Sequence, residues 1–194
     1  MPPYRNAVFA AAMSLAALGG TALSSALAPA IAEMTVEVGG APMYPSKNII
    51  ENAVNSKDHT TLVAAVKAAG LVETLQGDGP FTVFAPVNKA FEKLPKGTVE
   101  TLLKPENIAA LTGVLTYHVL PGKISAADFV AAVKKGGGEA TYKTVEGEEL
   151  TVKQNGRRLE IIDAKGGKSF VTIADINQKN GVIHVVDTVL LPKG

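Results

Sequence analysis

The three histidines are the side chains of this 194-residue chain best suited to acid–base or metal chemistry, and they lie far apart: His59, His118 and His184. No pair has the His-x-x-x-His spacing that brings two imidazoles to one face of a helix, so the sequence indicates no zinc site. His59 lies beside a predicted helix cap, where we expect an exposed side chain. The chain has no cysteine, which excludes thiol catalysis, disulfides and thiolate metal ligands.

Nucleophilic catalysis would need a serine or threonine next to a base. The sequence has no Gly-x-Ser-x-Gly motif, and the pattern of its hydroxyl residues indicates no triad. We therefore predict that the protein is not an enzyme and holds no metal or other cofactor. A triad assembled from residues distant in sequence is an alternative that the sequence leaves open.

Two polar residues lie within apolar patterns. A helix is predicted over residues 105–119, and its apolar stripe is formed by Ile108, Leu111 and Leu115. His118 continues this stripe, and Asp187 lies among valines in a predicted strand. Because buried polar groups are normally hydrogen-bonded, we expect both side chains to bond within the core.

The order of the predicted elements indicates an α+β fold, because helices come first and strands dominate later. Amphipathic patterns and cap residues predict helices over residues 46–54, 58–69, 88–94, 105–119 and 125–135, with Asn88 as one of the caps. Alternating apolar residues between turn signals predict strands over residues 81–85, 140–145, 150–153, 158–162, 169–173 and 181–190. Both faces of the last strand are apolar, so we expect it to be central and covered on both sides.

Residues 1–32 have the order of a secretory signal peptide. Arg5 is their only charged residue, an apolar run covers residues 7–18, and Ala30-Ile31-Ala32 is a small-residue cleavage site. An uncleaved membrane anchor fits less well, because a spanning helix needs about 20 apolar residues and two glycines interrupt this run. We expect cleavage before Glu33, a secreted or periplasmic protein, and no membrane segment after cleavage.

Removing the signal leaves a neutral chain of 18 basic and 18 acidic residues. This balance argues against a nucleic-acid partner and against electrostatic binding to anionic membranes. Residues 33–47 are rich in glycine and proline and are predicted to be a flexible lead-in. Residues 48–192 are long enough for one domain with a real core.

Three stretches together resemble the fasciclin-type (FAS1) domain family. They are Phe81-Thr82-Val83-Phe84-Ala85-Pro86-Val87-Asn88-Lys89-Ala90-Phe91, Thr116-Tyr117-His118-Val119-Leu120 and Asn180-Gly181-Val182-Ile183-His184-Val185-Val186-Asp187-Thr188-Val189-Leu190-Leu191-Pro192. Their order and spacing agree with the family over residues 48–192. The departure is Val87-Asn88, where the family often has Thr-Asp or Thr-Asn; a cap remains available, since Asn also caps helices well.

The resemblance implies a β-wedge of two sheets packed with several α-helices. It also implies an exported, non-enzymatic module for cell adhesion, similar to the small bacterial secreted or periplasmic members with one domain. Its partner would be a cell-surface, extracellular or matrix protein, and we expect a monomer. The alternatives are an envelope protein that binds a small ligand, a hydrolase with an unrecognised site, or a passive envelope protein.

The resemblance also assigns roles to particular residues. In the family the Tyr-His motif has been linked to receptor binding, which makes Tyr117 and His118 the candidate binding residues. The position of His118 on an apolar stripe favours a structural role for it instead. The remaining motif residues are expected to be structural: Phe81, Phe84, Asn88, Phe91, His184 and Asp187.

Overall fold

The computed structural model describes residues 35–193, so the predicted signal peptide lies outside the described residues. The strands are β1 (Val36–Val38), β2 (Ala41–Met43), β3 (Phe81–Pro86), β4 (Val119–Pro121), β5 (Glu139–Lys143), β6 (Glu149–Asn155), β7 (Arg158–Ile162), β8 (Lys168–Gln178) and β9 (Gly181–Val186). The α-helices are α1 (Ile49–Ala53), α2 (Thr60–Ala68), α3 (Val72–Gln76), α4 (Asn88–Glu92), α5 (Thr98–Leu102), α6 (Ile108–Tyr117) and α7 (Ala126–Lys135). Two 3₁₀ turns, Lys57–His59 and Pro105–Asn107, lead into α2 and α6.

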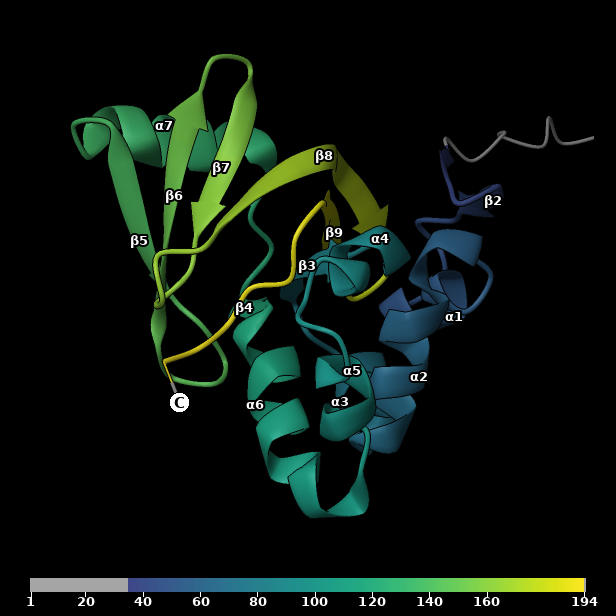
Figure 1. The fold of residues 1–194 in the computed structure, drawn as a ribbon. Helices are drawn as coiled ribbons and strands as arrows, with labels where there is room; N and C mark the ends of the chain where they lie inside the picture. Colours follow the sequence, from purple (N-terminus) through teal and green to yellow (C-terminus); the bar gives the residue numbers. More distant parts are fainter. Residues whose placement is uncertain (1–34, 194) are drawn as a thin grey trace, which may run out of the picture. The chain divides into compact units, whose positions relative to one another are not determined.

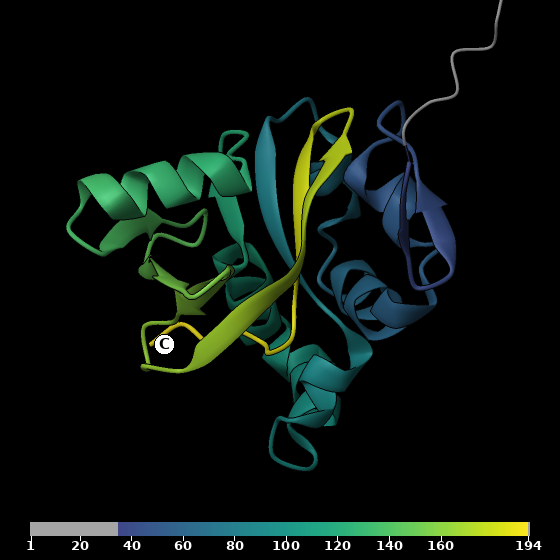
Figure 2. The same ribbon diagram turned by 90° about the horizontal axis from the view of Figure 1, so that it is seen from above.

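The expected α+β wedge is confirmed (Figures 1 and 2). The seven strands of the large sheet run in the order β4-β3-β9-β8-β7-β6-β5, and β3 pairs with β9 in parallel. The start of β8 pairs with β7, while the rest pairs with β9 through two register shifts. Within the second shift, between Ile173 and Ile176, Asp175 has a left-handed φ of 58°. Because bulges bend a strand, β8 divides the sheet into two arms.

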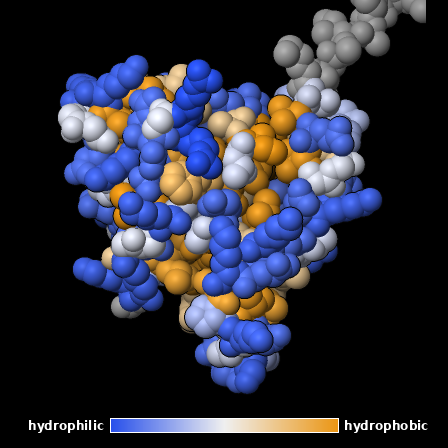
Figure 3. All heavy atoms as spheres, turned by 45° about the horizontal axis from the view of Figure 1, so that its top comes forward, coloured by the Kyte–Doolittle hydropathy of each residue, from blue (hydrophilic) through white to orange (hydrophobic). Residues whose placement is uncertain are grey.

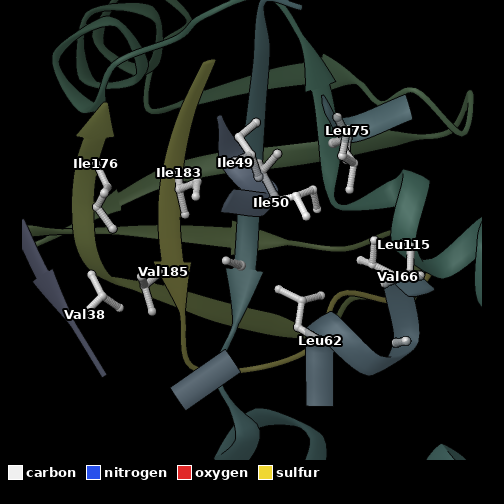
Figure 4. Packing of buried hydrophobic residues seen from close by; sticks show 14 of the residues in the cluster. Val38, Ile49, Ile50, Leu62, Val66, Leu75, Leu115, Ile176, Ile183 and Val185 are labelled. Atoms are coloured by element: carbon white, nitrogen blue, oxygen red, sulfur yellow. The ribbon is translucent and has the colours of Figure 1, made fainter. Parts of the chain in front are cut away.

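One arm consists of β4, β3, β9 and the end of β8, and α1 and α2 cover it. We call it the helical arm. Ile49 and Ile50 from α1 and Leu62 from α2 point at the strands, and Ile183 and Val185 of β9 meet them (Figure 4). Every residue of β9 is buried, as expected for a central strand. The cluster therefore joins the early helices to a strand near the end of the chain.

The other arm packs against α7, which lies along β5, β6 and β7 (Figure 2). The helix begins at a capping box in which the Ser125 hydroxyl accepts a bond from the backbone N–H of Asp128. The fully buried Phe129 ring then lies 5.8 Å from Phe84 and 5.0 Å from Tyr142, measured between ring centroids. These contacts attach α7 to both β3 and β5.

The prediction of a flexible lead-in is wrong for residues 36–43. These residues form the antiparallel β1–β2 hairpin, in which Val38, Ala41 and Met43 are buried in the core of the helical arm. Gly39 supplies the positive φ of the turn and packs against Ser56. The glycines and prolines that indicated a linker therefore mark a hairpin turn and an edge strand, positions that such residues also favour.

Candidate functional site

Tyr117, the first candidate binding residue, lies in the core at the end of α6. Its side chain is buried, and its hydroxyl donates to the Glu149 carbonyl at 2.9 Å. The same oxygen accepts the backbone N–H of Ala164 at 2.9 Å. Burial raises the pKa of Tyr117 to about 12. The phenol therefore connects α6 to the start of β6 and to the loop after β7.

His118, the second candidate, follows Tyr117 and is also buried, with 3% of its surface exposed. Its Nδ1 lies 2.7 Å from the Val114 carbonyl, which only accepts, so Nδ1 carries the proton. The backbone N–H of Leu190 donates to Nε2 at 2.9 Å. Burial lowers the pKa of His118 to about 4, although the Val114 bond acts in the opposite direction. Both nitrogens of this neutral ring are thus used within the fold.

His184 on β9 makes an equivalent pair of bonds on the side of the strand that faces Phe129 of α7. Its Nε2 donates to the Ile124 carbonyl at 2.9 Å, and the N–H of Asp175 lies 3.3 Å from Nδ1. Asp175 in turn accepts the N–H of Ala126 at 2.7 Å. Burial lowers the pKa of His184. The imidazole therefore holds the bend of β8 close to the start of α7.

The three phenylalanines of the first motif pack at three places around β3. Phe84 is fully buried between the arms, with its ring centroid 5.9 Å from that of His184. Phe81 and Phe91 are half-buried against the helical core. The structural role of these rings stays a prediction, which their packing around β3 supports.

Asn88 caps a helix, but not the helix that the sequence predicted. It is the first residue of α4, and its side chain makes no cap bond there. Its carbonyl oxygen instead accepts the N–H of Thr61 at 3.0 Å, in the first turn of α2, and its amide donates to the Lys57 carbonyl at 2.9 Å. The first-turn N–H groups of a helix need such acceptors. Asn88 thus supplies α2 with a cap from a distant segment.

Asp187 follows β9 and is half-buried among donors. Its carboxylate accepts the backbone N–H of Phe170 at 2.9 Å and the hydroxyl of Thr188 at 3.0 Å, and it lies 3.8 Å from the Lys93 ammonium. Partial burial opposes ionisation, but these donors together lower the pKa of Asp187. The carboxylate fixes the chain after β9 to β8.

The expected exposure of His59 is wrong, because only 4% of its surface is accessible. Its Nδ1 lies 2.9 Å from the hydroxyl of Ser56, three residues earlier. The β1–β2 hairpin, which the sequence analysis missed, contacts this segment through Gly39. The Ser-x-x-His spacing was the available signal that this imidazole has an internal partner.

The structure brings no catalytic or metal set together from these residues. Both ring nitrogens of His118 and of His184 already have backbone partners. Across residues 35–193, no group of three or more His, Asp or Glu side chains could hold a metal ion. Within the same range, no helix is both long and apolar enough to cross a membrane.

Two open hollows lie on the surface instead. One, of about 480 Å³, is lined by residues of α4, of α5 and of the connection between them, including Phe91, Glu100 and Leu94. The other, of about 300 Å³, is lined by Lys47, Glu51, Asp78 and Lys179 among others. Polar side chains cover most of the face in Figure 3, with apolar residues gathered between them. Neither hollow contains the Tyr-His pair, so direct contact between that pair and a partner would require α6 to move.

Comparisons with known proteins agree with this architecture. The chain matches the fasciclin domain family over residues 57–192. It is 46% identical to protein sll1483 of Synechocystis sp. over 160 residues, which cover 82% of each chain. It is also 32% identical to the immunogenic protein MPB70 of Mycobacterium bovis over 201 residues, covering 94% of this chain and 95% of that protein.

A solved structure shows the same fold. It is a FAS1 domain pair from the insect cell adhesion molecule Fasciclin I, which matches with a TM-score of 0.68 at 18% sequence identity. The match covers 82% of this chain but only 58% of that longer one. The family match extends over most of the described residues and the fold agrees with it, so this chain belongs to the fasciclin domain family.

Proposed function

We propose that the protein is an exported, non-enzymatic interaction domain that mediates cell adhesion or binds a protein of the cell surface or matrix. The observation that carries this proposal is the family match over residues 57–192. The resemblance of its three motifs implies modules of this kind, and residues 1–32 have the pattern of an export signal. The expected location is the periplasm or the medium, and the expected state is a monomer.

The arrangement of the titratable side chains supports a role without catalysis. A general base must come within hydrogen-bond reach of its substrate. Tyr117, His118 and His184 are buried, and each already makes two hydrogen bonds inside the fold. These side chains support the scaffold, which leaves the outer surface for binding.

The outer surface has a composition that a protein partner can use. Non-obligate protein interfaces are about as apolar as the rest of a protein surface. The face in Figure 3 has apolar residues set among polar ones, and the exported chain would be formally neutral. Recognition would therefore depend on shape and hydrogen bonds more than on long-range charge.

Attachment assays with three strains test the proposal. We expect that deleting the gene reduces cell–cell or cell–surface attachment and that the full gene restores it. A gene lacking residues 2–32 should not restore it, because its product would stay inside the cell. Purified residues 33–194 added to the deletion strain should restore attachment from outside.

Two results would count against the proposal. The first is attachment that is unchanged by the deletion across several surfaces. The second is rescue by the product that lacks the leader, which would place the function inside the cell. If neither result occurs, a pull-down from the cell envelope and the medium with residues 33–194 identifies the partner.

A further inference from the structure

The dipeptide Asn-Gly occurs twice in this chain, at Asn155-Gly156 and at Asn180-Gly181. Asparagine is a thermolabile residue, and a following glycine has no Cβ to shield its backbone nitrogen from the asparagine side chain. Both pairs lie at turns between antiparallel strands, the first between β6 and β7 and the second between β8 and β9. The two sites therefore share one chemistry, and their surroundings decide whether it proceeds.

The first pair lies at the tip of the β6–β7 hairpin, which projects from the molecule (Figure 1). Asn155, Gly156 and Arg157 are all exposed. The Asn155 carboxamide has no hydrogen-bond partner among residues 35–193. Gly156 has a positive φ of 62°, and nothing lies within 4 Å of the position that a Cβ would occupy. The side chain of Asn155 is thus free to turn toward the backbone of Gly156.

The second pair is held from several directions. Asn180 has only 6% of its surface exposed. Its Oδ1 accepts the backbone N–H of Ile49 at 3.1 Å, and its Nδ2 donates to the carbonyls of Leu75 and Gly77, both at 2.8 Å. The carboxamide of Asn180 can therefore react only after the structure around it has opened.

We propose that Asn155 is a site of spontaneous deamidation and that the fold protects Asn180 from the same reaction. The backbone nitrogen of Gly156 attacks Cγ of Asn155 and forms a succinimide ring, while the bond from Cγ to the amide nitrogen breaks. The proton lost by the attacking nitrogen leaves with that amide group as ammonia. Water then adds to either carbonyl of the ring and breaks its bond to the ring nitrogen, which leaves aspartate or isoaspartate. Overall, a water is consumed and an ammonia is released.

The products change the charge of the hairpin tip, and one of them changes its length. Either product places a carboxylate beside Arg157 and Arg158 and gives the formally neutral chain without residues 1–32 a net negative charge. Isoaspartate also adds a methylene to the backbone before Gly156. Because turn length fixes the register of a hairpin, the pairing of Asn155 with Arg158 is then lost. The buried Leu159 lies beyond this pair, so the change stays at the tip.

The same reaction at Asn180 would damage the core. An ionised aspartate has no N–H to donate to the Leu75 and Gly77 carbonyls, and its charge would face both oxygens with the Ile49 N–H as its donor. A buried charge that lacks sufficient partners is costly. The hydrogen bonds that join the β8–β9 turn to α3 therefore also keep this asparagine intact. The modification of Asn155 does not depend on the proposed interaction function.

Ageing the purified full chain in mildly alkaline buffer tests the proposal. Peptide mapping by mass spectrometry, with separation of aspartyl from isoaspartyl peptides, measures the reaction at each asparagine. We expect Asn155 to convert about a hundredfold faster than Asn180, because the three hydrogen bonds of Asn180 must break before it reacts. In urea that unfolds the chain, the two sites should convert at similar rates.

The chain offers matched controls for the glycine and for the products. Asn177 is also exposed but is followed by Gln178, so it should stay intact while Asn155 converts. Asn155→Gln should abolish conversion at that position, because its longer side chain closes a larger ring more slowly. Asn155→Asp should leave the urea midpoint nearly unchanged, whereas Asn180→Asp should lower it. If Asn180→Asp does not fold, the two rates in the natural chain decide alone.

Three results would overturn the proposal. Equal conversion of the two sites in the folded chain would show that the bonds of Asn180 give no protection. An Asn155 that stays intact in the folded chain but converts in urea would show that the hairpin keeps its carboxamide away from the Gly156 nitrogen. Absence of conversion at Asn155 even in urea would exclude the reaction itself.

Discussion

At the scale of single residues, the Tyr-His pair shows how polar atoms can hold a fold together from inside. Tyr117 bonds to two backbone groups that lie 32 and 47 positions further along the chain, and His118 accepts the N–H of Leu190, 72 positions away. The bond to Leu190 satisfies a buried backbone group that would otherwise be costly, and the two bonds of Tyr117 are partly buried. This geometry favours the structural role over receptor contact, and a binding role for the pair stays a prediction.

The first prediction concerns His118→Ala. The substitution leaves the Leu190 N–H buried without an acceptor and opens a cavity beside α6. We expect the free energy of unfolding to fall by about 2–4 kcal/mol. Urea denaturation followed by circular dichroism measures the change. Unchanged stability together with weaker partner binding would instead favour the receptor-binding role.

The second prediction concerns pH. The pKa of His118 falls from its usual 6.5 to about 4 on folding, and burial also lowers the pKa of His59 and His184. Between pH 6.5 and 4 the unfolded chain therefore binds more protons than the folded one, so acid favours unfolding. For His118 alone we expect a loss of roughly 3 kcal/mol across this range. Asp163 and Asp175 lie near enough to favour the charged rings and limit the loss.

The control for this pH effect is His118→Phe, measured by urea denaturation at several pH values. This variant lacks the titrating group, so its stability should depend less steeply on pH than that of the natural chain, whatever its absolute value. A natural chain whose stability stays constant from pH 6.5 to 4 would contradict the prediction. A free energy of unfolding that rises as the pH falls would contradict the predicted direction of the change.

At the scale of elements, the β1–β2 hairpin belongs to the folded core and gives a matched pair of variants. Met43 is 3% exposed in the core, whereas Val36 in the same hairpin is 37% exposed. We expect Met43→Ala to lower the free energy of unfolding by about 2–4 kcal/mol. Val36→Ala should change it by less than about 0.5 kcal/mol. Equal effects in urea denaturation would show that the hairpin does not pack as described.

Elements were predictable from the sequence where local signals agree with tertiary packing. The predicted strand 158–162 matches β7, and the box of Ser125 and Asp128 opens α7 as expected. The strand predicted at residues 169–173 continues to Gln178 in β8, beyond a bend that breaks the apolar alternation. The β4 strand and the β1–β2 hairpin are three residues per strand, too short for a periodic pattern.

For the candidate site, the sequence predicted the burial of His118 correctly, but it did not predict the hydrogen-bond partners. Apolar neighbours correctly indicated that His118 is buried, since the helical stripe continues to it. No local pattern could show that Asn88 caps α2, because that bond joins residues 27 positions apart. His59 was misjudged for the same reason, since the segments that bury it come from elsewhere in the chain. Long-range packing decides these contacts, and a single sequence does not display it.

At the scale of the whole molecule, a domain without cysteine depends on packing and hydrogen bonds for its stability. The chain contains no cysteine, so no disulfide can restrict the unfolded state. The two larger of three apolar clusters both include residues of the parallel pair β3 and β9. The bent β8 joins the arms, and His184 and Asp187 hold it on either side of that bend.

The last prediction concerns export and the start of the mature chain. We expect the protein recovered outside the cytoplasm to begin at Glu33, because Ala30-Ile31-Ala32 presents small residues where signal peptidase needs them. N-terminal mass spectrometry of the secreted and periplasmic fractions measures this directly. Ala32→Phe should make the precursor accumulate, or move cleavage to the position after Ala30, where Ala28-Pro29-Ala30 also presents small residues. An extracytoplasmic protein that still begins at Met1 would favour the membrane anchor, while a protein found only in the cytoplasm would also remove the basis for adhesion.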